Sequence, residues 1–293
     1  MLGSFLITLR EGLEAALVIG IILAYLSRTG NRGGFRPVWV GTALAIAVSL
    51  ITGGAIYLFA GALEEPGEAI FEGITMLIAA GVITWMIFWM RRQAVNIRAN
   101  LHSQIETALG RNPTLGLALI AFIAVAREGI ETVVFLFAAT QSENSPLMSF
   151  LGGITGLAVA VVIGYTIYIG TSRLNLKVFF NITGLLLMFF AAGLIAHGVH
   201  ELNEVGFIPP LIEHLWDMNN VIAEQSTPGR FLTALFGYNA NPSLTEILAY
   251  WIFLVTVLGS FFRSLRNERK VQGGTGKASR MLGSPSTPAA HRE

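Results

Sequence analysis

The sequence contains no cysteine, which excludes disulfide bonds and thiolate metal sites. Any metal ion must therefore be bound by oxygen or imidazole ligands. Charged residues make up only 13% of the 293 residues, against about 25% in average soluble domains. Hydrophobic residues make up 53%, and the mean hydropathy is +0.63. Together, these values indicate an integral membrane protein.

Several functional patterns are also missing. No glycine loop that could cradle a phosphate, no nucleophilic triad and no basic pattern typical of nucleic-acid recognition is present. We therefore expect neither an enzyme nor a nucleic-acid-binding protein.

Seven apolar stretches are long enough to cross a bilayer, which takes roughly 20 residues per helix. They predict an all-α membrane protein with spans at about 2–26, 38–63, 69–90, 114–139, 147–170, 177–200 and 243–262. The start, Met1-Leu2-Gly3-Ser4, lacks the basic segment of a cleavable signal peptide. We therefore expect the first stretch to remain as a span.

Basic residues lie almost entirely in alternate loops and in the C-terminal tail. Only Arg10, Arg127 and Arg230 of the 19 Lys and Arg residues lie elsewhere. The other loops are acidic, with Glu64, Glu65, Glu68, Glu143, Glu201, Glu204, Glu213, Asp217 and Glu224. Because short cytoplasmic loops are enriched in Lys and Arg, the N-terminus is predicted outside and the C-terminus inside.

The segments between the spans have signals of their own. Residues 91–113 carry Ile97, Leu101, Ile105 and Leu109 at helical spacing and predict a cytoplasmic interfacial helix that Asn112-Pro113 ends. Residues 201–242 predict an extracytoplasmic loop with breakers at Pro209-Pro210 and Pro228-Gly229. Ser243 and Glu246 predict a capping box that begins the last span, at 243–262. Residues 263–293 are predicted to form a disordered cytoplasmic tail.

Two near-identical pentapeptides, Arg10-Glu11-Gly12-Leu13-Glu14 and Arg127-Glu128-Gly129-Ile130-Glu131, lie inside the first and fourth spans. A charge at the bilayer centre costs several kcal/mol, so three charges in five residues, repeated, are unlikely to be an accident. Three spans separate one copy from the next, and an odd number inverts the second copy. Residues 1–90 and 114–200 are thus predicted to be inverted-topology repeats, a common transporter design.

A purely structural interpretation of each motif is an Arg–Glu ion pair at i,i+4, with glycine allowing close helix packing. That accounts for one glutamate per motif and leaves the second. Four glutamates and two arginines leave a formal charge of −2 in the membrane, which favours a cation. We hypothesise that carboxylates suited to Fe³⁺, Fe²⁺, Mn²⁺ or Mg²⁺ line its path, namely Glu11, Glu14, Glu128 and Glu131. Arg10 and Arg127 would hold them in place.

Two acidic groups on the predicted outer side are further candidates. One group lies at i, i+3, i+4 and i+7 at the end of the sixth span and consists of His197, His200, Glu201 and Glu204. This stripe could contact a transition metal, or it could be a solvated helix end. Glu65 and Glu68 fit ordinary helix-start signals beside Pro66. Glu72 lies deeper and is a candidate ligand at the outer entrance.

The paired Arg-Glu-Gly-Leu/Ile-Glu motifs in the first and fourth of seven spans resemble the oxidase-dependent iron permease family. That family includes fungal high-affinity iron permeases and bacterial Efe-type iron uptake permeases, and its signature Arg-Glu-x-x-Glu is matched in both copies. The resemblance covers residues 1–262. It implies a multi-pass protein of a bacterial plasma (inner) membrane, with iron as its substrate and no bound organic cofactor. It also implies periplasmic partner proteins that oxidise or bind iron.

The expected function is therefore import of Fe³⁺ or Fe²⁺ through the midplane carboxylates. Because a carboxylate must be ionised to bind a cation, uptake should fall as these groups protonate. The alternatives are a transporter of another divalent metal such as Mn²⁺ or Pb²⁺, a membrane redox subunit, and a subunit that only anchors partners. Contact of the basic tail with anionic lipid is expected, and a homo-oligomer is left open.

Overall fold

The long apolar stretches form helices because, without water, a spanning backbone must satisfy its hydrogen bonds within itself. The computed structural model describes residues 1–93, 97–141, 146–169, 176–223 and 226–282, and these contain no strand. Their α-helices are α1 (Leu2–Arg28), α2 (Phe35–Ala60), α3 (Gly67–Gln93), α4 (Ile97–Arg111), α5 (Pro113–Gln141), α6 (Pro146–Tyr168), α7 (Leu176–Glu204), α8 (Thr227–Phe236) and α9 (Leu244–Leu282). A short 3₁₀ turn, η1 (Arg32–Gly34), precedes α2.

Each of the seven predicted spans coincides with one long helix, but the helices fall into two classes. Five of them, α2, α3, α6, α7 and α9, contain stretches long and apolar enough to cross a membrane. The helices α1 and α5, of 27 and 29 residues, are not in this class. Each carries the three charges of its motif, which a membrane tolerates where neighbouring helices cover them.

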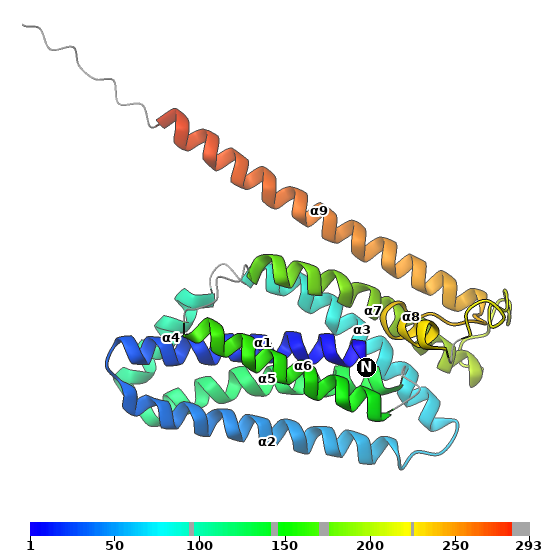
Figure 1. The fold of residues 1–293 in the computed structure, drawn as a ribbon, viewed down its shortest axis with the longest axis horizontal. Helices are drawn as coiled ribbons and strands as arrows, with labels where there is room; N and C mark the ends of the chain where they lie inside the picture. Colours follow the sequence, from blue (N-terminus) through cyan, green and yellow to red (C-terminus); the bar gives the residue numbers. More distant parts are fainter. Residues whose placement is uncertain (94–96, 142–145, 170–175, 224–225, 283–293) are drawn as a thin grey trace, which may run out of the picture. The chain divides into compact units, whose positions relative to one another are not determined.

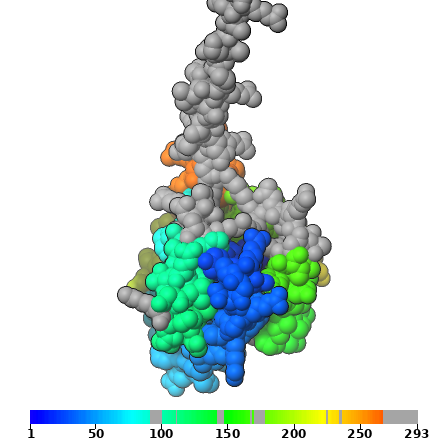
Figure 2. Space-filling model, turned by 90° about the vertical axis from the view of Figure 1, so that its left-hand side faces the viewer, coloured from blue at the N-terminus to red at the C-terminus, as the bar shows by residue number. Residues whose placement is uncertain are grey.

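The long helices pack in pairs that join the first half of residues 1–204 to the second half (Figure 1). The most extensive contacts are between α1 and α6, between α2 and α5, and between α3 and α7, and α1 also packs against α5. The two motif helices are therefore neighbours. Figure 2 views one end of this packing, where α1 (blue) lies between residues of α4 and α5 (blue-green) and residues of α6 (green).

The short helix α4 closes one end of the motif helices. Its Leu101 and Ile105 are buried in an apolar cluster with residues of α1, α2 and α5, and Leu109 packs against that cluster. Tyr25 on α1 donates a hydrogen bond to Glu106 at 3.1 Å. As predicted, α4 ends before Asn112 and α5 begins at Pro113.

The segment between α7 and α9 contains a helix where the sequence predicted a break. The hydroxyl oxygen of Ser226 accepts a hydrogen bond from the Gly229 N–H at 3.1 Å and caps α8. The expectation that Pro228-Gly229 prevents helix formation is wrong. Proline lacks a backbone N–H, but an N–H in the first turn of a helix has no hydrogen-bond partner within the helix, so its absence costs little there. The helix ends at Gly237, whose φ of +64° favours glycine.

The start of α9 confirms the predicted capping box. The Ser243 N–H donates to Glu246 Oε1 at 3.1 Å, and the Glu246 N–H donates to Ser243 Oγ at 3.2 Å. Residues 1–254 form one compact unit and residues from Val255 onward a second. In the second unit the helix continues to Leu282, whereas we expected disorder over residues 263–293. The stretch contains Gly273, Gly274 and Gly276, which are poor helix formers, but extending an existing helix is easier than starting one. Residues 283–293 of the predicted tail lie outside the described residues.

Candidate metal centre

The motif of α1 is buried. Arg10, Glu11 and Glu14 are 2%, 1% and 7% exposed. The predicted i,i+4 ion pair is present, with Arg10 Nε 3.2 Å from Glu14 Oε1. Arg10 Nη2 also donates to the sulfur of Met90 on α3 at 3.3 Å.

The motif of α5 forms the equivalent ion pair in a more open position. Arg127 Nε donates to Glu131 Oε1 at 3.0 Å and lies 4.0 Å from Glu128 Oε1. The Arg127 side chain is 36% exposed, and its guanidinium lies over the ring of Trp89, 4.2 Å from the ring centroid. The two motifs therefore share their sequence and internal pairing but not their burial.

The glycine of each motif allows a neighbouring helix to approach closely. A Cβ at Gly12 would lie 2.9 Å from the Ala160 Cβ on α6, and a Cβ at Gly129 would lie 2.9 Å from the Ser49 Cβ on α2 and closer still to its hydroxyl. Carbon atoms in ordinary contact are about 3.5–4.0 Å apart. Any side chain at these positions would thus push the motif helices away from their neighbours.

Three of the four predicted carboxylates converge between α1 and α5. Glu11, Glu128 and Glu131 each offer an oxygen, and these oxygens all lie within 4.8 Å of one another. Within the described ranges this is the one group of three or more candidate metal ligands. Glu14 is not part of it and pairs with Arg10 instead. We call Glu11, Glu128 and Glu131 the carboxylate trio.

Among the described residues, several oxygens of the trio, as ionised carboxylates, are buried without a hydrogen-bond partner. They are both carboxylate oxygens of Glu11, Oε2 of Glu128 and Oε2 of Glu131. Buried acceptors without partners are costly, and those in native structures call for an explanation such as an ion. Two ligands on opposite sides of an ion, each at about 2.1–2.6 Å, lie about 4.2–5.2 Å apart. One small cation could therefore contact all three carboxylates.

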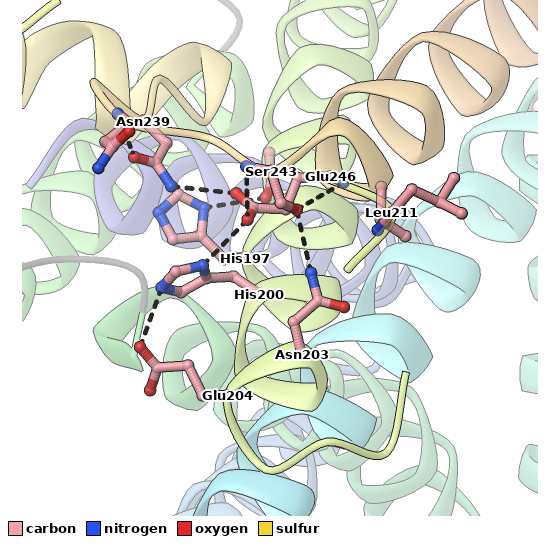
Figure 3. Close-up of polar contacts among 11 residues, drawn as sticks. His197, His200, Asn203, Glu204, Leu211, Asn239, Ser243 and Glu246 are labelled. Carbon is pink, nitrogen blue, oxygen red and sulfur yellow. Dashed lines mark hydrogen bonds and ion pairs between the residues drawn. The ribbon is translucent and has the colours of Figure 1, made fainter. Parts of the chain in front are cut away.

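The histidines predicted near the end of α7 belong to a separate polar network (Figure 3). His200 Nδ1 lies 3.0 Å from Glu246 Oε1 on α9, and its Nε2 lies 3.3 Å from Glu204 Oε1. Asn239 donates to the other oxygen of Glu246 at 3.0 Å. His197 Nδ1 contacts the Gly193 carbonyl oxygen at 3.0 Å. Only a capping role was predicted for Glu246, because no local pattern links it to a histidine 46 positions earlier.

Glu72 and Glu201 lie close enough to interact electrostatically, although they come from different helices. Glu72 is on α3 and Glu201 on α7, and both are half-buried. The helices touch through their backbones here, since a Cβ at Gly73 would lie 3.0 Å from the Gly198 carbonyl oxygen. The structure therefore gathers these two acids at one end of the α3–α7 pair, apart from the carboxylate trio.

Comparison with known proteins gives consistent matches over nearly the whole chain. Residues 1–266 match the model of the iron permease FTR1 family. A ferrous iron permease EfeU of Escherichia coli O6:H1 is 40% identical over 263 residues, which cover 89% of this chain and 95% of that protein. The Yersinia pestis protein of the same name is 38% identical over 264 residues, covering 89% and 93%. No solved structure matches this chain.

Permeases are transporters rather than enzymes, and the apolar helices are those of a multi-pass membrane protein. This chain belongs to the iron permease FTR1 family.

Proposed function

We propose that this protein imports iron across a bacterial inner membrane by passing the ion through the carboxylate trio. The observation that carries the proposal is the convergence of Glu11, Glu128 and Glu131, with four buried oxygens that lack hydrogen-bond partners in the part of the chain that the structure describes. Membership of the iron permease family and the names of its EfeU relatives support iron as the ion. Those relatives are named for ferrous iron, and hard carboxylate ligands accept either oxidation state.

We further propose seven spans, of which six form two inverted three-helix repeats and the seventh is α9. The helix contacts support this arrangement, since exchanging α1, α2 and α3 with α5, α6 and α7 turns each main packing pair into another or into itself. The close contacts at glycines follow the same exchange. Equivalent residues differ by 117 in residue number between α1 and α5 and by 111 between α2 and α6. The equivalent pairs are Gly41–Ala118 and Gly152–Met1, Ser49–Gly129 and Ala160–Gly12, and Gly53–Val133 and Gly164–Ala16.

In this topology the carboxylates have an order along the path. With the N-terminus outside, α1 runs inward, so that Glu14 lies one turn deeper than Glu11. The helix α5 runs outward, so that Glu131 lies one turn nearer the outside than Glu128. An incoming ion would thus approach from the side of Glu131, bind within the trio and leave past Glu14.

Glu72 and Glu201 at the α3–α7 end are proposed to collect cations before they reach the trio. His200 is less suited to this task because both of its ring nitrogens face carboxylates, those of Glu246 and Glu204. We assign His200 to holding the end of α7 against the start of α9. Glu204 and His197, on the same stripe, remain candidate contacts.

Uptake of radioactive iron by iron-starved cells that lack their own high-affinity importers tests the proposal. We expect Glu11→Gln, Glu128→Gln and Glu131→Gln each to abolish uptake at normal membrane abundance, because the amide keeps the shape but loses the charge that binds the ion. Glu106→Gln is the matched control, since Glu106 lies on α4 with an exposed hydrogen bond. Normal uptake by all three trio variants would make the motifs packing devices and overturn the proposed path.

The same assay separates the alternative substrates and functions. Competition by excess Mn²⁺ or Pb²⁺ stronger than that by unlabelled iron would indicate a transporter of another divalent metal. Supplying iron as Fe²⁺ with a reductant, or as Fe³⁺ with a weak chelator, tests which oxidation state is carried. A bound chromophore in the purified protein would favour a redox subunit.

A further inference from the structure

A stripe of polar side chains on α1 leads to the carboxylate trio. Ser4, Thr8 and Glu11 are spaced i, i+4 and i+7, which places them on one face of the helix. Because a helix rises about 1.5 Å per residue, Thr8 lies about 4.5 Å and Ser4 about 10.5 Å from Glu11 along the axis. In the proposed topology α1 begins outside, so both hydroxyls lie on the outer side of the trio.

Both hydroxyls are buried and have free acceptor capacity. Ser4 is 0% and Thr8 5% exposed. The Thr8 hydroxyl donates to the Ser4 carbonyl oxygen at 2.9 Å, which occupies its proton and leaves the lone pairs of its oxygen. The Ser4 hydroxyl has no hydrogen-bond partner among the described residues. A buried hydroxyl without a partner is costly and calls for an explanation.

Thr8 lies where three helices meet. A Cβ at Gly156 on α6 would overlap the Thr8 hydroxyl. A Cβ at Gly153 would lie 3.6 Å from Thr8 Cγ2 and 3.6 Å from Leu136 Cδ1 on α5. The glycines of α6 therefore leave room for the Thr8 side chain between α1, α5 and α6, one turn away from Glu11.

The second repeat lacks this polar stripe on its motif helix. Ser4 and Thr8 correspond to Ala121 and Val125 on α5, which precede Glu128 by the same seven and three residues. Both are buried in the apolar cluster that contains Ile105 of α4. In the proposed topology these positions lie on the inner side of the trio. The motif helices therefore present hydroxyls outside the trio and apolar side chains inside it.

We infer that Ser4 and Thr8 are ligands of a transient cation site on the outer path, where iron exchanges part of its water shell before it reaches Glu11. Hard cations bind oxygen ligands, and oxygens that replace the hydration shell ease the entry of an ion into a membrane protein. A purely structural interpretation, a hydroxyl bonded within its own helix, accounts for Thr8 but not for the hydroxyl of Ser4. This inference rests on the proposed function of the trio and on the proposed topology.

The test is the concentration dependence of iron uptake by the full chain in cells, at measured membrane abundance. Thr8→Val keeps the shape and loses the hydroxyl oxygen, so uptake at limiting iron should fall about ten-fold, equivalent to about 1.4 kcal/mol. The maximal rate should stay within about two-fold because the trio is intact, so that KM rises by nearly the same factor. Ser4→Ala should lower uptake at limiting iron about three-fold, and Thr8→Ser, which keeps the oxygen, should stay within about two-fold of the native protein.

Thr183 on α7 offers a matched control. It is 5% exposed, like Thr8, and its hydroxyl donates to the Phe179 carbonyl oxygen four residues earlier at 3.0 Å. Thr183→Val therefore removes the same atom from the same kind of hydrogen bond, on a helix that carries no residue of the trio. We expect it to take up iron with the native KM and maximal rate.

The outcomes distinguish this inference from the proposed function. If Glu128→Gln is inactive while Thr8→Val has the native KM, the trio stands and the outer cation site is overturned. If Glu128→Gln transports normally, the proposed function itself fails.

Two comparisons exclude a packing effect. Equal losses in Thr8→Val and Thr8→Ser, or in Thr8→Val and Thr183→Val, would show that the hydroxyl oxygen of Thr8 has no role in the path and would overturn the inference. If Thr8→Val does not reach the membrane, Thr8→Ala is compared with Thr8→Ser, since these two also differ in the hydroxyl. Absence of both Thr8→Val and Thr8→Ala from the membrane, with Thr8→Ser present, would make this hydroxyl a folding group only and would likewise overturn the inference.

Discussion

The contact between Gly129 and Ser49 offers a way to shift the carboxylate trio without changing any of its three glutamates. A Cβ at Gly129 would lie 2.9 Å from the Ser49 Cβ, against 3.4–4 Å in ordinary contact. Rotating the Ser49 hydroxyl away relieves its own clash but not that between the two Cβ atoms. Gly129→Ala should therefore push α5 from α2 by several tenths of an ångström to about 1 Å and cost about 1–3 kcal/mol of stability.

Iron uptake should fall by more than the loss of stability alone would cause, because metal sites tolerate changes in ligand distance of only about 0.2 Å. The same shift moves Glu128 and Glu131 relative to Glu11, which lies on α1. We expect the initial rate of iron uptake to fall about 10- to 100-fold at near-normal membrane abundance, since misplacements of this size cost about that much in other active sites.

The second-site variant Ser49→Gly removes both clashing atoms and should restore most of the uptake by Gly129→Ala. Gly20→Ala is the control, because it adds a Cβ on the motif helix α1 where no atom of the described residues lies within 4 Å. Native uptake by Gly129→Ala would refute the reasoning. So would a double variant that is present in the membrane but no more active than Gly129→Ala alone.

Two further predictions concern particular contacts, and a third concerns the proposed topology. Gly12→Ala, whose Cβ would lie 2.9 Å from that of Ala160, should reduce uptake like Gly129→Ala and be rescued by Ala160→Gly; no rescue would argue against equivalent repeats. Glu246→Gln weakens several hydrogen bonds to a buried carboxylate and should lower thermal stability in detergent by about 1–3 kcal/mol while leaving uptake measurable; an unchanged melting temperature would contradict this. Because the chain has no cysteine, a single cysteine at Ser103 should react with a membrane-impermeant thiol reagent only from the inside and one at Glu64 only from the outside; the reverse would invert the proposed topology.

Local patterns in the sequence predicted the features that depend on neighbouring residues. Apolar stretches identified the long helices, since hydrocarbon length and helix rise fix how many residues a span needs. The i,i+4 spacing predicted the Arg10–Glu14 pair, found at 3.2 Å, and Ser243-x-x-Glu246 predicted the observed capping box. In each case the partners are at most four residues apart, and helix geometry alone brings them together.

The features that depend on packing between helices could not be predicted from local sequence patterns. Sequence favoured four equivalent carboxylates, whereas the structure groups Glu11 with Glu128 and Glu131 and leaves Glu14 with Arg10. Which glutamate joins the group depends on how α1 and α5 are rotated and staggered. Close contacts at Gly12 and Gly129 help to set that arrangement. Hydrophobic periodicity does not indicate which residue of another helix a glycine will contact. The contacts of Trp89 and Met90 are of the same kind, because they are made across helices.

The unequal burial of the two motifs implies that equal substitutions will have unequal effects. Arg10 is 2% exposed, so Arg10→Gln would leave Glu14 buried without its cation, a change that costs about 3–5 kcal/mol in other proteins. Arg127 is 36% exposed, where loss of an ion pair costs less. Arg10→Gln should therefore mainly reduce the amount of protein in the membrane, and Arg127→Gln should mainly reduce uptake per molecule present. Quantifying membrane abundance beside initial uptake separates the two effects. Equal loss of abundance in both variants would mean that the burial difference has no energetic consequence.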